Sequence, residues 1–467
     1  MGHSRTASSY ARLLRAIRER EARVAVLGQG YIGLPLSLLL AKAGFEVVGF
    51  DVNSRLIQRL SAGLVPFPGE VGLCDLLELV KRSGKYKPTS DAVDIRGSDI
   101  YIIAVSTPRI NGGEPDLSYL RSAVDIVKVS IDRDSLVVVE STVPPGTTAG
   151  FVARKLARVS WVRTFVAHCP ERAMPGRLIE ELTRAHRVIG GIDKESGQLA
   201  KELYATFSRG EITVTDALTA EIVKLVENTY RDVNIALANE IARICSALGV
   251  SAKQVIELAN MHPRVALLRP GIGVGGSCLT KDPLFLANAA LERGYTPELI
   301  LKARMINESM PELAAREILD FVDSTERNRS RALVAVLGTA YKGGVSDARG
   351  SPAGQLIRLL LSEGVKVRAY DPRCSEFFGA DATEDPYEAA EGACCVVLAT
   401  DHPEFYELDL ASLRRCAEDG PVLFYDGRLM FRREEVEKAG FVYSGIGEPL
   451  FRLSELIGAR VGTRQRA

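Results

Sequence analysis

The 467-residue sequence predicts an α/β protein with two parallel-sheet domains joined by a segment of long helices. Two observations predict this architecture. A strand, a turn and a helix follow one another at residues 23–44, and a similar succession recurs at 333–367. Between the two copies, apolar residues recur at helical spacing over 219–248 without a glycine or proline, which is typical of one long helix.

The first copy has the pattern of a βαβ unit. Residues 23–27 form a short apolar run that is typical of a buried strand, and the GxGxxG turn 28–33 opens a helix over 34–44. A second strand at 46–50 ends at Asp51. Three later apolar runs are expected to be further parallel strands: 100–105, 136–139 and 165–167.

The middle of the chain is expected to be helical, and the end repeats the beginning. After the helix at 219–248, helices are expected at 252–260, 283–293 and 297–325, before a polar junction at 326–331. The second copy has Ala340 in place of the second glycine. This duplicated Rossmann-like half is therefore not expected to hold a dinucleotide in the same way. The expected divisions are an extension at 1–20, a dinucleotide-binding domain at 21–212, a helical central domain at 213–328 and a second Rossmann-like domain at 329–467.

Composition excludes several classes of function. Lys plus Arg equals Asp plus Glu at 59 each, so no bulk charge recruits nucleic acid or an anionic membrane. No apolar run approaches the roughly 20 residues of a membrane span. Residues 1–20 are polar and basic, which indicates a short surface helix or a disordered extension and no signal peptide. Eight cysteines without disulfide-like spacing or a CxxC pair favour the reducing cytoplasm and no metal site.

The first copy carries a complete dinucleotide signature. The glycines of residues 28–33 let the backbone approach a pyrophosphate at a helix N-terminus. Asp51 can accept hydrogen bonds from a ribose diol and would repel a 2′-phosphate, so NAD is favoured over NADP. The alternatives are a tight turn in an unrelated α/β domain and an FAD site, which uses the same fingerprint.

Cys278 is the most informative single residue. It follows the turn Gly275–Gly276 and precedes Lys281 and Asp282. A nearby positive charge favours the reactive thiolate, and a thiolate beside a nicotinamide cofactor suggests oxidation through a thiohemiacetal and a thioester. The alternative is a small buried hydrophobe. The remaining cysteines lack such surroundings and are expected to be structural: Cys74, Cys169, Cys245, Cys374, Cys394, Cys395 and Cys416.

Other candidates lie on the long helix and after strands. Lys224, Asn228 and Arg231 share one helical face, which suits phosphate, sugar hydroxyls or acid–base work, or is simply a solvated polar stripe. Glu171 and Thr142 follow strand ends, where ligands of α/β sheets bind; a surface salt bridge with Arg172 is the alternative for Glu171. Weaker candidates in turns are His262, Arg264, Lys342, Arg349 and Arg428.

Taken together, these segments resemble the UDP-glucose/GDP-mannose dehydrogenase family. The likeness runs in order from Arg23 to the C-terminal region. It implies an NAD-binding domain, a long-helix dimerisation segment and a domain that holds the UDP of a sugar nucleotide. It also implies two successive hydride transfers from C6 of the sugar to two NAD⁺. The segments that carry it are 28–33, 107–108, 141–144, 170–171, 224–228, 275–278, 281–282, 341–342, 347–349 and 426–428.

The resemblance implies a role for each candidate residue. Cys278 is the nucleophile, Lys224 is the acid/base or oxyanion partner with Asn228 beside it, and three further residues handle water: Glu171, Asp282 and Thr142. The implied cofactor contacts are Gly28, Gly30, Tyr31, Ile32, Gly33, Asp51, Thr107, Thr142 and Arg349. The implied substrate contacts are Arg172, Ala173, Lys224, Asn228, Arg231, His262, Arg264, Gly275, Tyr341, Lys342 and Arg428. Arg264 matches a residue that reaches the partner subunit's substrate in relatives, which implies a homodimer or a larger homo-oligomer.

The substrate branch is indicated by three segments. Residues 169–177, 187–191 and 262–265 resemble the branch that oxidises UDP-N-acetylhexosamines, with UDP-N-acetyl-D-mannosamine favoured, in cytoplasmic polysaccharide biosynthesis. Ser277 and residues 279–281 are instead similar to the UDP-glucose type. UDP-N-acetylglucosamine and UDP-glucose therefore stay open as substrates. A catalytically silent nucleotide-sugar-binding protein and a two-electron dehydrogenase of the hydroxyacid or 6-phosphogluconate type are more distant alternatives.

Overall fold

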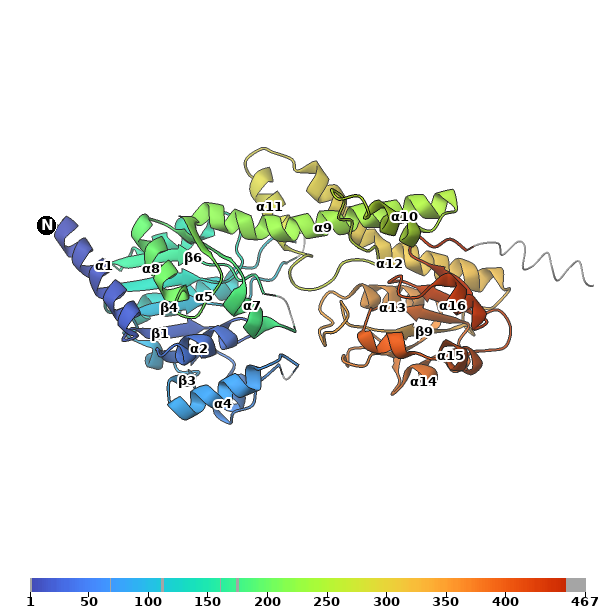
Figure 1. Cartoon of the computed structure of the whole chain (residues 1–467), viewed down its shortest axis with the longest axis horizontal. Coiled ribbons are helices and arrows are strands. Elements are labelled where there is room, and N and C mark those ends of the chain that lie inside the picture. Colours follow the sequence, from blue (N-terminus) through green and yellow to red (C-terminus); the bar gives the residue numbers. More distant parts are fainter. Residues whose placement is uncertain (1, 68, 111–112, 160, 174–175, 451–467) are drawn as a thin grey trace, which may run out of the picture. The chain divides into compact units, whose positions relative to one another are not determined.

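The computed structural model describes residues 2–67, 69–110, 113–159, 161–173 and 176–450 (Figure 1). Met174 and Pro175 of the segment 169–177, and Met1 of the N-terminal extension, lie outside them. The chain divides into two compact units, each described by itself. The first unit comprises Met1–Asn228 and Lys281–Thr296, and the second comprises Thr229–Thr280 and Pro297–Ala467.

The first unit is built on an eight-stranded sheet with the order β3-β2-β1-β4-β5-β6-β7-β8. All neighbouring strands are parallel except β6 and β7. The five strands expected from the sequence are confirmed, two with the expected ends and three with ends shifted by one or two residues, and β3, β7 and β8 are additional. The strands are β1 Arg23–Leu27, β2 Glu46–Phe50, β3 Tyr86–Thr89, β4 Ile100–Ile103, β5 Ser135–Val139, β6 Thr164–His168, β7 Arg187–Gly191 and β8 Ile212–Asp216.

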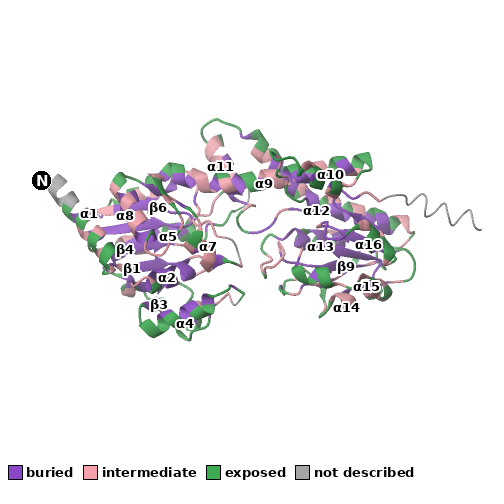
Figure 2. Cartoon of the chain, viewed as in Figure 1, coloured by how far each residue is buried: buried purple, intermediate pink, exposed green. Residues whose placement is uncertain are grey.

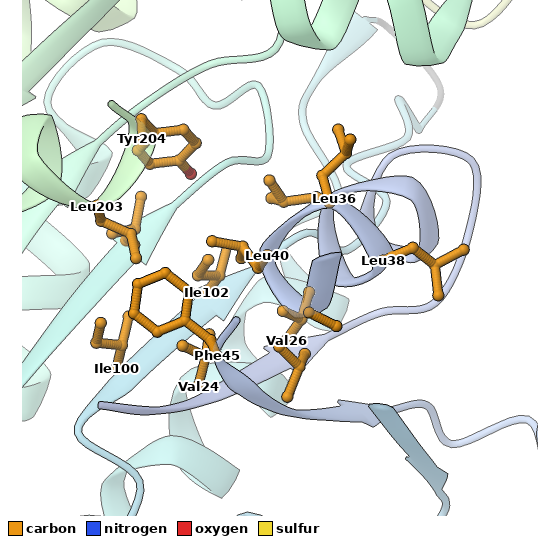
Figure 3. Close-up of a cluster of buried hydrophobic side chains, with 14 of the residues drawn as sticks. Val24, Val26, Leu36, Leu38, Leu40, Phe45, Ile100, Ile102, Leu203 and Tyr204 are labelled. Atoms are coloured by element: carbon orange, nitrogen blue, oxygen red, sulfur yellow. The ribbon is translucent and has the colours of Figure 1, made fainter. Parts of the chain in front are cut away.

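Helices pack on this sheet because its inner strands are apolar on both faces. Val24 and Val26 of β1 and Ile100 of β4 point toward Leu40 of helix α2 and toward Phe45, and all five side chains are fully buried (Figure 3). The helices of this unit are α1 Gly2–Glu19, α2 Gly33–Lys42, α3 Ser54–Ser61, α4 Leu73–Ser83, α5 Ser118–Ser130, α6 Arg154–Leu156, α7 Leu178–Arg184, α8 Lys194–Tyr204 and α11 Asp282–Leu291, with the short 3₁₀ helix η1 Ala92–Ile95 and the π-helix η3 Thr148–Ala153.

The N-terminal extension is a helix that packs against the first unit. Leu13 and Ile17 of α1 are fully buried in the same core as β1 and α2. Arg12 Nη1 donates to Asp99 Oδ1 at 2.7 Å. Of the two expectations for this segment, the helix is correct. Because two of its apolar side chains are buried, it adds to the core and does not merely cover the surface.

The second unit is built on a six-stranded sheet with the order β11-β10-β9-β12-β13-β14, in which every neighbouring pair is parallel. This order repeats that of strands β3-β2-β1-β4-β5-β6 in the first unit. The duplication extends to the turns, since Gly28 N donates to Phe50 O at 2.8 Å and Gly338 N donates to Tyr370 O at 2.7 Å. The strands are β9 Leu333–Leu337, β10 Lys366–Tyr370, β11 Asp381–Ala382, β12 Cys395–Leu398, β13 Leu423–Asp426 and β14 Val442–Gly445. The helices are α10 Ala252–Ala259, α12 Glu298–Ser324, α13 Pro352–Ser362, α14 Pro386–Ala390, α15 Leu410–Cys416 and α16 Arg433–Lys438, with the short turn η4 Pro403–Glu407.

The two copies differ at the aspartate that follows their second strand. Asp371 is buried, and its Oδ2 accepts from Thr339 N at 2.6 Å and Ala340 N at 2.9 Å and lies 3.1 Å from His402 Nε2. Asp51, in contrast, is half-buried. The carboxylate of the second copy is therefore saturated by its own fold, which supports the expectation that it does not hold a dinucleotide as the first copy does.

The predicted long helices are present. Helix α9 runs over Ala217–Leu248 and is continuous from one unit to the other (green in Figure 1), and α12 follows as a second long helix. Buried residues concentrate in the strands of both sheets (purple in Figure 2). None of the helices in the described part of the chain is long and apolar enough to cross a membrane.

Candidate active site

The glycine-rich turn after β1 has the shape that a dinucleotide requires. Gly28 has a φ of +93°, and a Cβ there would lie 2.4 Å from Ala104 O. A Cβ on Gly33 would lie 1.8 Å from Gly28 O, whereas a Cβ on Gly30 would meet nothing within 4 Å. Two glycines are thus required by the turn itself, and Gly30 leaves open space before α2. Because Ile32 gives that helix no side-chain cap, its first N–H groups suit a pyrophosphate.

The other expected cofactor residues of this unit lie at the carboxyl ends of its strands. Asp51 follows β2, and its Oδ2 accepts from Gln29 N at 2.8 Å, which fixes the glycine turn. Thr107 Oγ1 donates to Thr142 O at 2.7 Å, joining the loops after β4 and β5. Tyr31 donates its hydroxyl to Glu70. Asp51, Thr107 and Thr142 therefore lie along one edge of the first sheet, whereas Arg349, which is also expected to contact the cofactor, belongs to the second unit.

Glu171 follows β6 with an unusual carboxyl group. Its Oε1 is shielded from solvent and has no hydrogen-bond partner among the described residues. Burial raises the pKa of Glu171 to about 7, and the positive charge of Lys224 on α9 opposes that rise. A carboxyl group with a pKa near neutrality is suited to general acid–base work. The alternative of a salt bridge between Glu171 and Arg172 is wrong, because Arg172 pairs with Glu227 and donates to His186 O at 2.9 Å.

Asn228 and Asp282 meet in a buried pair. Asn228 Nδ2 donates to Asp282 Oδ2 at 2.6 Å, and Lys281 Nζ lies 2.6 Å from Asp282 Oδ1. Asp282 is fully buried, and both of its oxygens are engaged. Lys281, which the sequence indicated as the positive charge near Cys278, therefore pairs with Asp282 in this group. The carboxylate fixes the amide of Asn228, so Lys224 and Asn228 stand one helical turn apart on the same face of α9.

A further buried acid, which sequence reasoning missed, lies close enough to Glu171 and Lys224 to interact with their charges. Glu140, at the end of β5, is fully buried, accepts from Tyr204 Oη and has Arg187 Nη1 at 3.7 Å. Burial raises the pKa of Glu140 to about 7, against the Arg187 and Lys224 charges. The only signal in the sequence was its position directly before Ser141. Glu221 was also missed: its carboxylate accepts from Thr148 N at 2.7 Å and from Gly146 N, which fixes the loop after β5.

The second unit brings several predicted residues together around Cys278, which is exposed. Gly276 N donates to Arg349 O at 3.0 Å. A Cβ on Gly275 would lie 2.6 Å from Gly350 O, and a Cβ on Gly276 would lie 2.8 Å from the Tyr341 ring. The glycine pair is therefore required by close packing on residues 341–350. The pKa of Arg349 is raised mainly by its hydrogen bonds to Asp347. The negative charge of a Cys278 thiolate raises it further, so the two charges attract each other.

Arg428 and Lys342 lie at the carboxyl edge of the second sheet. Arg428 Nη2 is 3.1 Å from Asp401 Oδ1, and the same oxygen accepts from Gly343 N at 3.1 Å. A Cβ on Gly271 would lie 2.6 Å from Arg428 Nη1. Arg428 thus lies against the start of the loop that carries Cys278, and Asp401 ties it to the turn that directly follows Lys342.

Three expected substrate residues are exposed on the second unit. Arg231 lies on α9, and His262 and Arg264 lie on the turn after α10. Burial raises the pKa of the Tyr341 hydroxyl, which lies beside Cys278, and the positive charge of Arg231 acts on that hydroxyl and opposes the rise. Arg264 N donates to His262 Nδ1 at 3.3 Å, and among the described residues no hydrogen bond or ion pair joins either side chain to the residues around Cys278.

No two of the eight cysteines, all of which are described, form a disulfide. Cys74 is exposed and Cys416 is partly exposed, while burial raises the pKa of the Cys169 thiol to about 12. In the described ranges, no group of three or more His, Cys, Asp or Glu side chains is placed to hold a metal ion.

The fold and the glycine turn define a dinucleotide-binding α/β protein with a duplicated sheet. Three family models match it in order: the NAD-binding domain at residues 22–208, the central domain at 218–309 and the UDP-binding domain at 335–433 of the UDP-glucose/GDP-mannose dehydrogenase family. The chain belongs to this family. The resemblance, the fold class and the NAD cofactor expected from the sequence are confirmed.

Individual relatives are similar over nearly the whole chain. A UDP-N-acetyl-D-mannosamine dehydrogenase of Pyrococcus horikoshii is 44% identical over 91% of this chain and 99% of its own. One from Methanocaldococcus jannaschii is 40% identical over 91% of this chain and 96% of its own. The solved structure of the UDP-D-ManNAc dehydrogenase of Pyrococcus horikoshii superposes with a TM-score of 0.85 at 42% identity, covering 91% and 99% of the two chains.

Proposed function

We propose that this protein oxidises UDP-N-acetyl-D-mannosamine at C6 to UDP-N-acetyl-D-mannosaminuronate. The reaction converts –CH₂OH to –COO⁻ with loss of four electrons. When bound, NAD⁺ accepts one hydride in each of two oxidation steps. The likeness to named UDP-N-acetyl-D-mannosamine dehydrogenases over nine-tenths of the chain is the observation that carries the substrate assignment.

The protein's own residues provide the chemistry between the two oxidations. The Cys278 thiolate attacks the aldehyde carbon and forms a thiohemiacetal, which keeps the half-oxidised sugar bound. Loss of the second hydride gives a thioester, which water cleaves to release the acid and the thiol. Lys224 and Asn228 stabilise the oxyanion of each tetrahedral state. One such donor typically contributes about 3–4 kcal/mol.

Glu171 is the base that activates the hydrolytic water, and Thr142 helps to position that water. Because both Asp282 oxygens are engaged with Asn228 and Lys281, Asp282 acts through the orientation of Asn228. Gly28, Gly30, Tyr31, Ile32, Gly33, Asp51, Thr107, Thr142 and Arg349 contact the cofactor. Arg172, Ala173, Arg231, His262, Arg264, Gly275, Tyr341, Lys342 and Arg428 contact the substrate.

The assembly and location belong to the same proposal. Large apolar side chains on α9 and α10 are exposed, including Leu237, Ile244, Leu248, Val255 and Leu258, and exposed apolar side chains on two successive helices suit a homodimer or a larger homo-oligomer. Thiols without disulfides suit the cytoplasm. We retain the divisions 1–20, 21–212, 213–328 and 329–467 as proposed domain boundaries.

A substrate panel tests the proposed activity. We expect purified enzyme to reduce two NAD⁺ per molecule of UDP-N-acetyl-D-mannosamine, measured as NADH absorbance together with mass spectrometry of the acid. UDP-N-acetylglucosamine and UDP-glucose should turn over at least about tenfold more slowly, since a misfitted polar substituent costs over 1 kcal/mol. Turnover of UDP-glucose alone would overturn the substrate assignment. One NADH per sugar would overturn the four-electron chemistry.

The cofactor preference is expected to depend on Asp51. In Asp51→Asn the side chain keeps its size but loses the carboxylate that accepts hydrogen bonds from two ribose hydroxyls. We expect the KM for NAD⁺ to rise about 5- to 30-fold, as for the loss of one or two charge-assisted hydrogen bonds, and NADP⁺ to gain relative to NAD⁺. Steady-state kinetics with each cofactor measure this. Asp75→Asn, at an exposed carboxylate of α4, is the control and should change neither KM.

A further inference from the structure

The loop that carries Cys278 has no regular structure of its own. Residues 260–281 connect α10 to α11 without a helix or a strand, and Cys278 lies near its end. Irregular segments this long inside a compact fold are uncommon and are often functional. Nucleophilic attack needs a thiol held within a fraction of an ångström of its position. The surrounding structure must therefore fix the main chain of this loop.

Four buried polar side chains on two helices form one continuous hydrogen-bond network beneath the loop. Arg304 Nη1 donates to Asp232 Oδ1 at 2.7 Å. Asn307 Nδ2 donates to Asp232 Oδ1 at 2.8 Å and to Asp232 O at 2.9 Å. Asn239 Nδ2 donates to Asn307 Oδ1 at 2.9 Å. We call this set the loop network: Asp232 and Asn239 of α9, and Arg304 and Asn307 of α12.

The loop network ends in two main-chain groups of the loop. At one end, Asn239 Oδ1 accepts from Gly271 N at 2.9 Å. At the other, Arg304 Nη1 donates to Leu279 O at 3.4 Å. These two contacts bracket Cys278, and the second is made at the residue directly after it. The network therefore joins both sides of the nucleophile to the two long helices.

The burial of the loop network argues against a role in stability alone. Arg304 is 3% exposed, and Asn239 and Asp232 are fully buried. Arg304 Nε and Asp232 Oδ2 are buried and have no hydrogen-bond partner among the described residues. A buried ion pair left partly unsatisfied is often no more stable than apolar side chains of the same volume. What the network provides, and apolar side chains would not, is directional contact with the loop.

We propose that the loop network positions Cys278, with Arg304 as its principal positioning residue. One terminal nitrogen of the guanidinium donates to both Asp232 Oδ1 and Leu279 O, and the other donates to Glu308 Oε1 at 3.0 Å. A lysine would keep the buried charge but not this planar fork. This inference rests on the proposed function only in taking Cys278 as the nucleophile, and it holds for any sugar nucleotide.

Arg304→Lys tests the inference through the thiol itself. Iodoacetamide is applied without sugar or cofactor, and mass spectrometry of the Cys278 peptide gives the alkylation rate against pH. We expect the rate at neutral pH to fall about threefold or more and the midpoint of its pH profile to rise, because Cys278 is displaced from the Arg349 charge that favours thiolate. In turnover, kcat should fall about 10- to 100-fold with the KM for NAD⁺ within about twofold of the wild-type value.

Two further variants separate positioning from folding. Glu308→Gln removes the half-exposed partner of the same guanidinium and should leave the alkylation profile and kcat unchanged. Asn239→Asp removes the hydrogen bond to Asn307 at the other end of the loop network while keeping the acceptor for Gly271 N. It should therefore lower the alkylation rate and kcat as Arg304→Lys does. If Arg304→Lys does not fold, Asn239→Asp tests the proposal in its place. If Arg304 has only a structural role, Arg304→Lys lowers the melting temperature but leaves the alkylation profile of the folded enzyme unchanged. That result overturns the proposal. A shifted profile with no turnover of any sugar would refute the proposed function and keep this inference.

Discussion

Cys278→Ala is expected to abolish formation of the uronic acid. Without the thiol there is no covalent thiohemiacetal to carry the aldehyde to the second oxidation, so acid production should fall by about 10³-fold or more. A slow first oxidation can survive, and Cys278→Ser should form a sluggish ester. Chromatography of the sugar nucleotides measures acid and aldehyde separately, and NADH per sugar should fall from two toward one.

The matched control for this variant is Cys74→Ala. Cys74 is the other cysteine that the structure exposes, on α4 of the first unit. It should retain the full rate and stoichiometry of the wild type, which shows that loss of an exposed thiol is not itself harmful. Acid production by Cys278→Ala at the wild-type rate would refute the role of this sulfur.

The fold was predictable because its main signals are local. The apolar run at residues 23–27, the glycine turn after it and Asp51 lie within 30 residues of one another. In the structure each has the position that the sequence predicts. The long helix α9 was equally visible from its spacing. In contrast, β8 at Ile212–Asp216 was not predicted, since its polar and half-exposed residues give no apolar run. Its place in the sheet is fixed by hydrogen bonding to β7, a tertiary contact that its own residues do not reveal.

The candidate site was predictable only in part, for a similar reason. Cys278 and Asp51 carry a local signature of glycines and charges. The residues that were missed act through contacts that are distant in sequence: Arg304 meets Asp232 across 72 positions, and Glu140 meets Tyr204 across 64. No spacing rule joins such pairs. Their common property is burial of a charged group, and burial becomes visible only when the chain is folded.

The pKa of Glu171 leads to a second large effect, on hydrolysis of the thioester. A general base works only as the carboxylate, and burial raises the pKa of this group to about 7. Below pH 7 Glu171 is protonated and cannot accept a proton from water. The rate of acid release should therefore fall tenfold for each pH unit below about 7 and reach a plateau above it. A rate that stays level between pH 5 and 7 would contradict this assignment.

Glu171→Gln should remove this pH dependence along with the base. The amide preserves the shape of the side chain but cannot take the proton, so hydrolysis should slow by about 10²- to 10⁴-fold. Because both oxidations precede hydrolysis, the variant should still produce a burst of two NADH per active site and then stall. Intact-mass spectrometry of the stalled enzyme should show one uronyl nucleotide attached, and digestion should locate it on Cys278.

Glu181→Gln is the control for the charge environment of Glu171. The Glu181 carboxylate lies close enough to raise the pKa of Glu171, although it contributes less than burial does. Its neutralisation should move the acidic limb of the rate profile slightly toward lower pH, with no accumulation of the acyl-enzyme. If Glu171→Gln instead stalls before any NADH forms, the carboxylate is needed for the first oxidation, and the water-activating base must be sought elsewhere.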